Sequence, residues 1–322
     1  MAEYINIRGQ SIEVVASDPA NPTIGQIWYN STSNTLKGES YAAGAWASGG
    51  NMSTARSSLA SASNATQDAA LAVGGYNNLT ATEEYDGSTW TAGGALGTGR
   101  HDLAGAGTQT AGLVAGGTSN TTATEEYNGS AWTAGGALGT GRNYAGSCGT
   151  QTAALAFGGF PTGTTATEEY DGASWTAGGS LTTPRRSAAG AGIQTAALAI
   201  AGFDTGVPGV IASTEEYNGS TWTAGGNVNT ARTWASGAGI QTSALVFGGE
   251  ALPSPTITAA TEEYDGTTWT NVASLSAVKE LLGGAGSTSQ GIAFAGRNTT
   301  VNLATTEEWT GAGPVTKTIT AS

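Results

Sequence analysis

The chain has few of the side chains from which redox, metal and nucleic-acid sites are usually built. Its 322 residues include one cysteine, Cys148, and one histidine, His101, so no intrachain disulfide is possible. Eleven lysine and arginine residues stand against 24 aspartate and glutamate residues, and the net charge is −13. Proteins that follow a phosphate backbone need a basic stripe, which this composition does not supply. The composition therefore argues against nucleic acid and anionic membranes as partners.

Long apolar runs and helix signals are also missing. No stretch approaches the length that a membrane-spanning helix needs, and Met1–Tyr4 lacks the basic and apolar pattern of a secretory signal. The 51 glycines do not indicate a disordered chain, because aromatic residues recur among them at fixed spacing. We therefore expect an all-β protein without membrane insertion.

A sequence repeat dominates the chain. The motif Thr-Glu-Glu-Tyr begins at Thr82, Thr124, Thr167, Thr214 and Thr261, and a last copy at Thr306 has Trp309 in place of tyrosine. The tyrosines at 85, 127, 170, 217 and 264 lie 42 to 47 residues apart. A period in the forties indicates a repeat architecture in which each unit packs against its neighbours.

Each repeat contains signals for four short strands. The tyrosine is followed by Asp-Gly or Asn-Gly, a strong hairpin signal, and by a tryptophan five residues on. A cation, a run of small residues, a turn and an apolar run ending in Gly-Gly or Ala-Gly then follow. Four-stranded antiparallel units at this period predict a β-propeller. The strand of small residues suits the crowded centre.

The ends of the repeat indicate how the ring closes. The spacing from Tyr41 to Trp46 matches the hairpin of the motif, whereas Pro314 stands where the last copy should have its tryptophan. Because proline cannot donate to a strand ladder, we expect the Trp46 strand to complete the last blade. This arrangement predicts six blades. Seven blades remain the alternative, and Val315–Thr320 is expected to add an edge strand or to pair elsewhere.

The repeat resembles the kelch family. The resemblance covers about residues 41–310 and lies in the glycine doublet, the Glu-Tyr pair, the tryptophan and the arginine that opens the next unit. The doublet is altered at Ala201-Gly202 and Ala295-Gly296. The resemblance implies a kelch-like β-propeller, and with the blade count above we expect an all-β, six-bladed kelch-like β-propeller. It implies little about function, because such folds host many activities.

Repeated charges form the most regular polar pattern. One cation follows each tryptophan by ten residues, which gives a structural cation ring of Arg56, Arg100, Arg142, Arg185, Arg232 and Lys279. We expect each cation to pair with a motif glutamate and to join neighbouring blades. The expected partners are Glu84, Glu126, Glu169, Glu216, Glu263 and Glu308. The alternative is a ring that holds an anionic ligand at the mouth of the pore. The recurring turn glutamines are expected to form hydrogen bonds within their turns.

Little in the sequence points to catalysis or metal binding. Paired glutamates on an alternating strand point to opposite faces, whereas a catalytic pair must face one pocket. His101 has no nucleophile in a recognised setting and is expected to be a surface or loop histidine. Cys148 is expected to be a small buried strand residue. We therefore predict no catalytic residue, no metal and no cofactor.

The loops between the second and third strands differ from repeat to repeat. Function tends to lie where a rigid scaffold carries variable loops. The aromatic and polar residues of this end are predicted to form a face that binds a sugar or a protein: Tyr76, Asn77, Asn78, Tyr144, Phe160, Phe203, Asp204, Trp234, Glu250 and Asn298. Ordinary loop variation is the alternative, because single exposed aromatic residues are common.

Residues 1–35 lie outside the repeat and are predicted to be a short N-terminal β arm, with residues 36–322 as the propeller. Ile5–Ile7, Ile12–Val14 and Ile27–Asn30 are expected to be short strands. The segment of residues 21–38 resembles the leading segment of marine bacteriophage structural and tail-fibre-like proteins. So do the similar stretches Gly49–Arg56 and Gly225–Arg232. This resemblance implies a component of the virion.

Together these features predict a non-enzymatic fibre, spike or decoration protein of a phage particle. The arm would contact other virion proteins or a second copy of the chain, and the loop face would bind a host glycan or protein. One alternative is a glycan-active enzyme, which needs an unrepeated acid or base in the pore. The unusual residues available for it are His101, Asp102, Glu250 and Glu280, which we expect to be scattered. Another alternative is a cellular kelch module that binds proteins.

Overall fold

The computed structural model describes residues 12–161, 164–204, 209–251 and 256–319. The chain forms two compact units. One comprises residues 1–44 and 311–322, and the other, the repeat unit, comprises residues 45–310. Residues 36–44 and 311–322, which the sequence assigns to the propeller, thus group with the N-terminal segment.

The described part of the repeat unit contains six four-stranded antiparallel sheets. The strands of the first two are β5 (Ala60–Ser61), β6 (Leu71–Val73), β7 (Thr82–Tyr85), β8 (Trp90–Ala92), β9 (Ala104–Gly107), β10 (Gly112–Ala115), β11 (Thr124–Tyr127) and β12 (Trp132–Ala134). The next two contain β13 (Gly146–Thr150), β14 (Ala153–Phe157), β15 (Thr167–Tyr170), β16 (Trp175–Ala177), β18 (Ala189–Ile193), β19 (Ala196–Ile200), β22 (Thr214–Tyr217) and β23 (Trp222–Ala224). The fifth contains β25 (Ser236–Ile240), β26 (Ser243–Phe247), β29 (Thr261–Tyr264) and β30 (Trp269–Val272). The only helical segments in these residues are two 3₁₀ turns, η2 (Gln67–Ala69) and η3 (Thr118–Asn120).

The sixth sheet combines both ends of the repeat unit. It consists of β31 (Gly283–Gly286), β32 (Gln290–Phe294), β33 (Thr306–Thr310) and β4 (Ala45–Ser48), with Trp309 opposite Trp46. This pairing confirms that the Trp46 strand supplies the fourth strand. The hairpin expected over residues 39–46 does not form. Its first half belongs to β3 (Thr35–Ala42), which lies outside the repeat unit and pairs with two other strands there instead of with β4.

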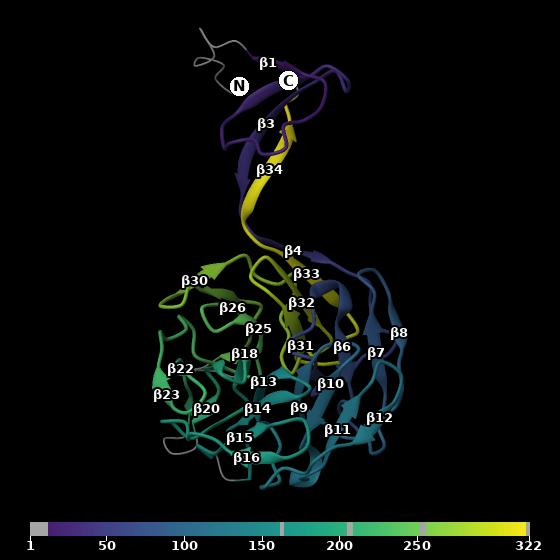
Figure 1. Ribbon diagram of the computed structural model, residues 1–322, viewed down its shortest axis with the longest axis vertical. Helices are drawn as coiled ribbons and strands as arrows, with labels where there is room; N and C mark the ends of the chain where they lie inside the picture. Colours follow the sequence, from purple (N-terminus) through teal and green to yellow (C-terminus); the bar gives the residue numbers. More distant parts are fainter. Residues whose placement is uncertain (1–11, 162–163, 205–208, 252–255, 320–322) are drawn as a thin grey trace. The chain divides into compact units, whose positions relative to one another are not determined.

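The first strand of each sheet lies innermost, next to the first strands of the neighbouring sheets (Figure 1). Small residues allow this approach. A Cβ atom added at Gly190 would lie 2.2 Å from the carbonyl oxygen of Ser147 on the neighbouring sheet, and one at Gly105 would lie 2.3 Å from that of Ser61. The glycine-rich first strands therefore lie at the centre of a propeller-like all-β arrangement, as the sequence predicts.

Apolar and aromatic side chains fill the space between neighbouring sheets. The Tyr264 and Trp269 rings stack at 4.8 Å within one hairpin. The Tyr264 hydroxyl donates to Glu216 of the preceding sheet over 2.6 Å, and the indole of Trp222 donates to Thr167 of the sheet before its own over 3.0 Å. The motif thus fixes each sheet to the one before it.

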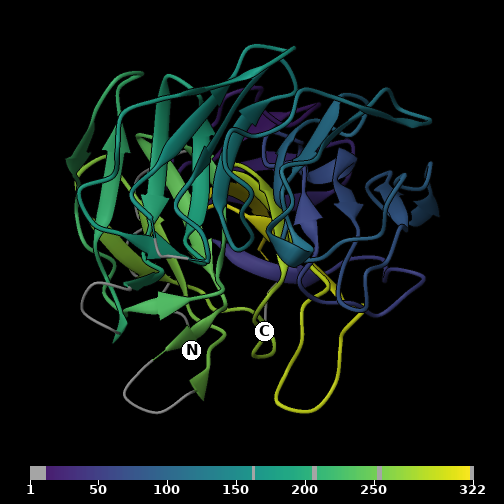
Figure 2. The ribbon, with the colours of Figure 1, turned by 90° about the horizontal axis from the view of Figure 1, so that it is seen from below.

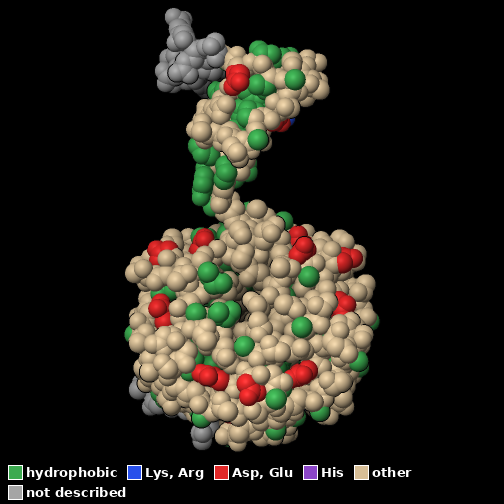
Figure 3. Space-filling model, viewed as in Figure 1, with side chains coloured by type: hydrophobic (Ala, Val, Ile, Leu, Met, Phe, Trp, Pro, Cys, Tyr) green, Lys and Arg blue, Asp and Glu red, His purple; other side chains and the backbone are tan. Residues whose placement is uncertain are grey.

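The variable loops extend on one side of the sheets, as Figure 2 shows for the yellow loop that follows β32 and the green loops that precede it. Two of them form small additional sheets. One joins β17 (Arg185–Arg186), β20 (Phe203–Asp204) and β21 (Gly209–Val210), and the other joins β24 (Arg232–Thr233), β27 (Glu250–Ala251) and β28 (Thr256–Ile257). In the repeat unit, the face drawn in Figure 3 carries acidic side chains around its periphery.

The N-terminal unit is a four-stranded sheet in the order β1 (Glu13–Val15), β2 (Ile27–Asn30), β3 and β34 (Gly313–Thr318). Its β34 is the C-terminal strand expected from Val315–Thr320, and the expected strand at Ile5–Ile7 lies outside the described residues. Asp18 accepts hydrogen bonds from Lys37, Asn30 and Trp28. These bonds lower the pKa of Asp18 to about 2, and the bond from Lys37 has the largest effect.

Candidate functional site

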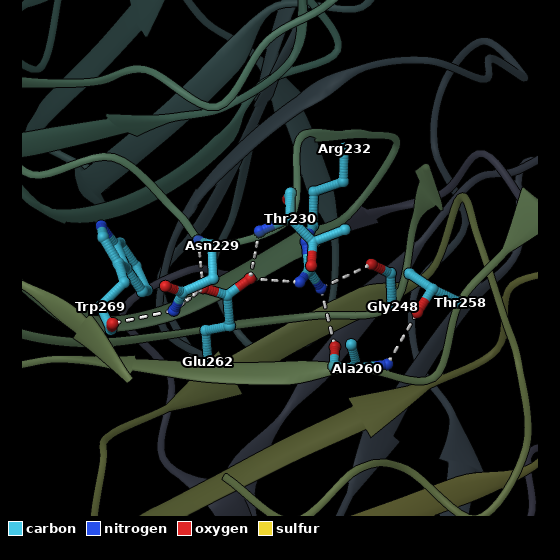
Figure 4. Close-up of polar contacts among 8 residues, drawn as sticks. All are labelled: Asn229, Thr230, Arg232, Gly248, Thr258, Ala260, Glu262 and Trp269. Atoms are coloured by element: carbon cyan, nitrogen blue, oxygen red, sulfur yellow. Dashed lines mark hydrogen bonds and ion pairs between the residues drawn. The ribbon is translucent and has the colours of Figure 1, made fainter. Parts of the chain in front are cut away.

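The repeated cations are buried and bind carboxylates and carbonyls of the scaffold, although the Nε atoms of Arg56, Arg100 and Arg185 have no hydrogen-bond partner among the described residues. Arg232 is 0% exposed, and its guanidinium donates to Glu262 over 2.5 Å and to the carbonyls of Gly248 and Ala260 over 3.2 and 2.8 Å (Figure 4). The other pairs are Arg56–Glu83, Arg100–Glu125, Arg142–Glu168, Arg185–Glu215 and Lys279–Glu307. These cations hold the loop that leads into each sheet. Because they are buried and paired with glutamates, they are not available to bind an anionic ligand.

The glutamate partner differs from the predicted one. Each cation binds the first glutamate of the motif, not the second, because the two point to opposite faces of the strand. The second glutamate accepts a hydrogen bond from a motif tyrosine of the next sheet. These pairs are Tyr127–Glu84, Tyr170–Glu126, Tyr217–Glu169, Tyr264–Glu216 and Tyr85–Glu308. Glu263 has no such pair among the described residues, since Trp309 replaces the tyrosine, and burial raises its pKa. The tyrosines rather than the cations therefore join neighbouring sheets through the motif.

The turn glutamines also join neighbouring sheets, where bonds within the turns were expected. The side-chain amide of Gln109 donates to the carbonyls of Ala70 and Tyr85, over 3.2 and 2.6 Å. Gln67 reaches in the same way to Gly291 and Trp309, so the first sheet contacts the sixth. Gln290 lies on β32 instead of in the equivalent turn.

A second ring of residues lies two positions after the cations. Its members, here called the collar, are Ser58, Asp102, Tyr144, Ser187, Trp234 and Leu281. All six have φ between 52° and 57°. Their backbones form a closed cycle in which each N–H donates to the carbonyl of the preceding collar residue, over 2.8 to 3.2 Å, and Ser58 donates to Leu281. The scaffold thus fixes six side chains of different chemistry at equivalent places.

A cavity of about 490 Å³ lies against the collar. Collar residues Asp102, Tyr144 and Trp234 line it, together with His101 and Arg297. Further lining comes from Tyr76 and from the loop 298–302. The cavity therefore lies at the end of the repeat unit that carries the variable loops, and most of its lining does not repeat.

The most buried titratable group of the cavity is Asp102, which is 8% exposed. Its Oδ2 lies 3.4 Å from His101 Nε2, while its Oδ1 is buried with no hydrogen-bond partner among the residues that the structure describes. Burial raises the pKa of Asp102, against the opposing influence of His101, Tyr144 and Ser58. Burial and the Asp102 charge raise the pKa of Tyr144 to about 12.

His101 is positioned by other loop residues. Its Nδ1 lies 2.9 Å from Asn78 Oδ1 and 2.9 Å from Thr118 Oγ1, and its ring lies 5.8 Å from that of Tyr76. The histidine that was expected to be a surface or loop residue is thus held in a polar network at the cavity.

A second acidic group adjoins the cavity. Glu280 is 1% exposed, and its Oε1 accepts a hydrogen bond from Arg297 Nε over 2.7 Å. Burial and the neighbouring Glu280 raise the pKa of Glu250. The scatter expected for His101, Asp102, Glu250 and Glu280 is therefore wrong in part, because the first two line the cavity and Arg297 links it to Glu280.

The predicted loop residues fall into separate groups. Tyr76, Tyr144, Trp234 and Asn298 line the cavity, and Asn78 reaches it through His101. Phe160 and Phe203 instead flank the guanidinium of Arg186, at 5.7 and 4.8 Å from their ring centres. Asn77, Asp204 and Glu250 do not line the cavity.

Sequence reasoning missed Ser58, His101, Asp102, Leu281 and Arg297 as neighbours in one cavity. A signal was available. The two positions that follow each cation differ in almost every repeat, whereas the next position is always leucine or alanine. Cys148 is buried as expected, and burial raises its pKa to about 12.

No cluster of three or more potential metal ligands occurs within the described ranges. Those ranges also contain no helix long and apolar enough to cross a membrane. Neither a protein-family model nor a curated protein matches this chain.

Proposed function

We propose that the repeat unit is a closed, six-bladed propeller of the kelch type. The closed cycle of backbone hydrogen bonds through the six collar residues supports this proposal. The junction between the first and sixth sheets supports it further, because Tyr85 donates to Glu308 and Trp90 to Thr306 as at the other junctions. A scaffold of this kind holds the collar rigidly.

We also propose that the chain is a non-enzymatic structural component of a bacteriophage particle. Support comes from the resemblance of residues 21–38 to the leading segment of marine phage structural proteins. The N-terminal unit would contact other virion proteins, and the loop end would bind a host surface glycan or protein. Mass spectrometry of purified particles of the source phage, with gold-labelled antibody to the repeat unit, tests this assignment. A particle that lacks the chain contradicts it.

A single observation carries the binding role. Non-repeating aromatic, acidic and basic side chains gather at one cavity of a scaffold whose other contacts repeat from sheet to sheet. Binding of the labelled chain to host cells is expected to weaken when Trp234 or Tyr144 is replaced by alanine. Unchanged binding of both variants would contradict the role of this end.

A glycan-active enzyme is the second candidate, favoured by Asp102. This unrepeated carboxyl lies in the cavity, and burial raises its pKa, as a general acid requires. Release of reducing sugar from host polysaccharide by the wild type, abolished in Asp102→Asn, would establish this candidate and displace the non-enzymatic one.

A further inference from the structure

The collar residues have a left-handed backbone conformation that residues other than glycine rarely adopt. All six positions require a positive φ, for which glycine is the least strained residue, yet each carries a side chain. Trp234, Tyr144 and Leu281 are bulky residues, whose presence in this region of φ is uncommon. Backbone strain of this kind tends to persist at functional sites, where a side chain is needed in one place.

Two buried polar atoms of the cavity lining lack hydrogen-bond partners among the described residues. Asp102 Oδ1 is a buried acceptor, and the indole Nε1 of Trp234 is a buried donor, and neither has a hydrogen-bond partner in the described parts of the chain. Buried polar atoms are rarely left in this state, so each such atom requires an explanation. Both residues line the same cavity, which indicates a ligand that can donate and accept.

Other features of the cavity narrow the class of ligand. The Nε atom of Arg297 donates to Glu280, whereas its Nη atoms have no partner among the described residues. The Arg297 side chain is 49% exposed, so these Nη atoms can reach a ligand. Tyr144 and Trp234 add aromatic surface to a cavity of about 490 Å³, within the range of small-molecule sites. Hydroxyl groups both donate and accept, and the C–H faces of a sugar ring pack on aromatic rings.

We propose that this cavity binds a single saccharide ring. The Asp102 carboxylate accepts hydrogen bonds from ring hydroxyls, the Arg297 guanidinium donates to them, and Trp234 with Tyr144 packs against the apolar face of the ring. The inference rests on the proposed function only in assuming that this end of the repeat unit binds a ligand. It specifies that the ligand is a carbohydrate and that it binds against the collar.

The test uses the full chain with D-glucose, D-galactose, D-mannose and N-acetyl-D-glucosamine as separate probes. Saturation-transfer NMR and tryptophan fluorescence report binding. We expect at least one sugar to bind, and Asp102→Asn to weaken its binding by about tenfold or more, since the charge and one of the two acceptor oxygens are lost. Trp234→Ala should weaken binding similarly, and circular dichroism verifies that each variant is folded. The isosteric Asp102→Asn keeps the test valid if the Trp234 variant does not fold.

Phe160→Ala is the matched control, because Phe160 is an exposed aromatic residue of the same end that does not line the cavity. Its sugar binding should equal that of the wild type. Binding that survives Asp102→Asn and Trp234→Ala, or failure of all four sugars, overturns the inference. In the latter case, host-cell binding that still depends on Trp234 leaves the proposed function standing with a ligand other than carbohydrate.

Discussion

Arg232 illustrates how one residue secures a repeat. Its guanidinium is fully buried and binds one carboxylate and two carbonyls. Removing one partner of a buried ion pair typically costs about 3–5 kcal/mol, because the remaining charge is left uncompensated. We expect Arg232→Met to lower the free energy of unfolding by about this amount, measured by urea denaturation.

Two comparisons give this prediction its meaning. Arg232→Lys keeps the charge but loses the planar guanidinium, so we expect it to lower the free energy of unfolding by less than Arg232→Met does. Lysine is compatible with this position, because Lys279 occupies the equivalent place in the sixth sheet and binds Glu307 over 2.8 Å. Lys317→Met, on the exposed part of β34, should change stability by less than about 0.5 kcal/mol. Equal losses for the Met variants at 232 and 317 would contradict a stabilising role of the buried pair.

The motif tyrosines predict a dependence on alkaline pH. Burial, followed by the hydrogen bond to Glu216, raises the pKa of Tyr264 to about 12, and Tyr85, Tyr170 and Tyr217 reach similar values. The folded state thus favours the neutral phenol, and this stabilisation is complete below the ordinary pKa of about 10. It is lost as the pH rises from about 10 through 12. We expect unfolding in that interval, monitored by circular dichroism together with phenolate absorbance.

A variant pair identifies the tyrosines responsible. Tyr264→Phe removes one titrating group, so its stability should fall less steeply between pH 10 and 12, from a slightly lower value at neutral pH. Tyr41→Phe, which alters a tyrosine that is 64% exposed in the N-terminal unit, should leave the pH dependence unchanged. Titration of the Tyr264 phenol near pH 10 in the folded protein would refute this account.

At the scale of the strand, close approach at the centre limits side-chain size. A Cβ atom at Gly190 would lie 2.2 Å from the Ser147 carbonyl oxygen, a backbone atom that cannot move aside cheaply. We expect Gly190→Ala to lower the free energy of unfolding by about 1–3 kcal/mol or more. Gly313→Ala on β34 is the control, since nothing lies within 4 Å of its added Cβ. A neutral Gly190→Ala would show that the first strands pack more loosely than described.

The strands themselves were largely predictable from sequence. The Asp-Gly and Asn-Gly turns, the alternation of the Thr-Glu-Glu-Tyr strand and the small residues of the first strand each act over a few residues, so local patterns indicate them. The identity of the glutamate that meets the cation was not predictable. It depends on which face of the strand the connecting loop crosses, and this path is fixed by bonds to Gly248 and Ala260 and their equivalents.

At the scale of the whole molecule, the cavity escaped prediction because its lining comes from repeats far apart in sequence. Asp102, Tyr144, Trp234 and Arg297 belong to different repeats. The closed cycle of collar hydrogen bonds brings the first three together, and backbone bonds with Glu280 place Arg297 beside them. Each residue alone has an ordinary explanation as a loop residue. Only the comparison of equivalent positions across the repeats distinguishes them, since the two positions after each cation vary while the motif itself is nearly constant.

The joining of the two ends of the repeat unit gives the last prediction. Strand β4 places Trp46 opposite Trp309, which is 0% exposed, and the Trp46 ring also lies 5.1 Å from Phe247 of the preceding sheet. Trp46 is partly buried against this core, so Trp46→Ala should cost up to about 3–5 kcal/mol, the range for a large aromatic residue removed from a core. A chain reduced to residues 45–310 keeps every described strand of the six sheets and should unfold with nearly wild-type stability. A chain reduced to residues 49–310 lacks β4 and should be destabilised at least as much as Trp46→Ala. Equal stability of the two shortened chains, compared by urea denaturation, would show that β4 does not hold the ends together.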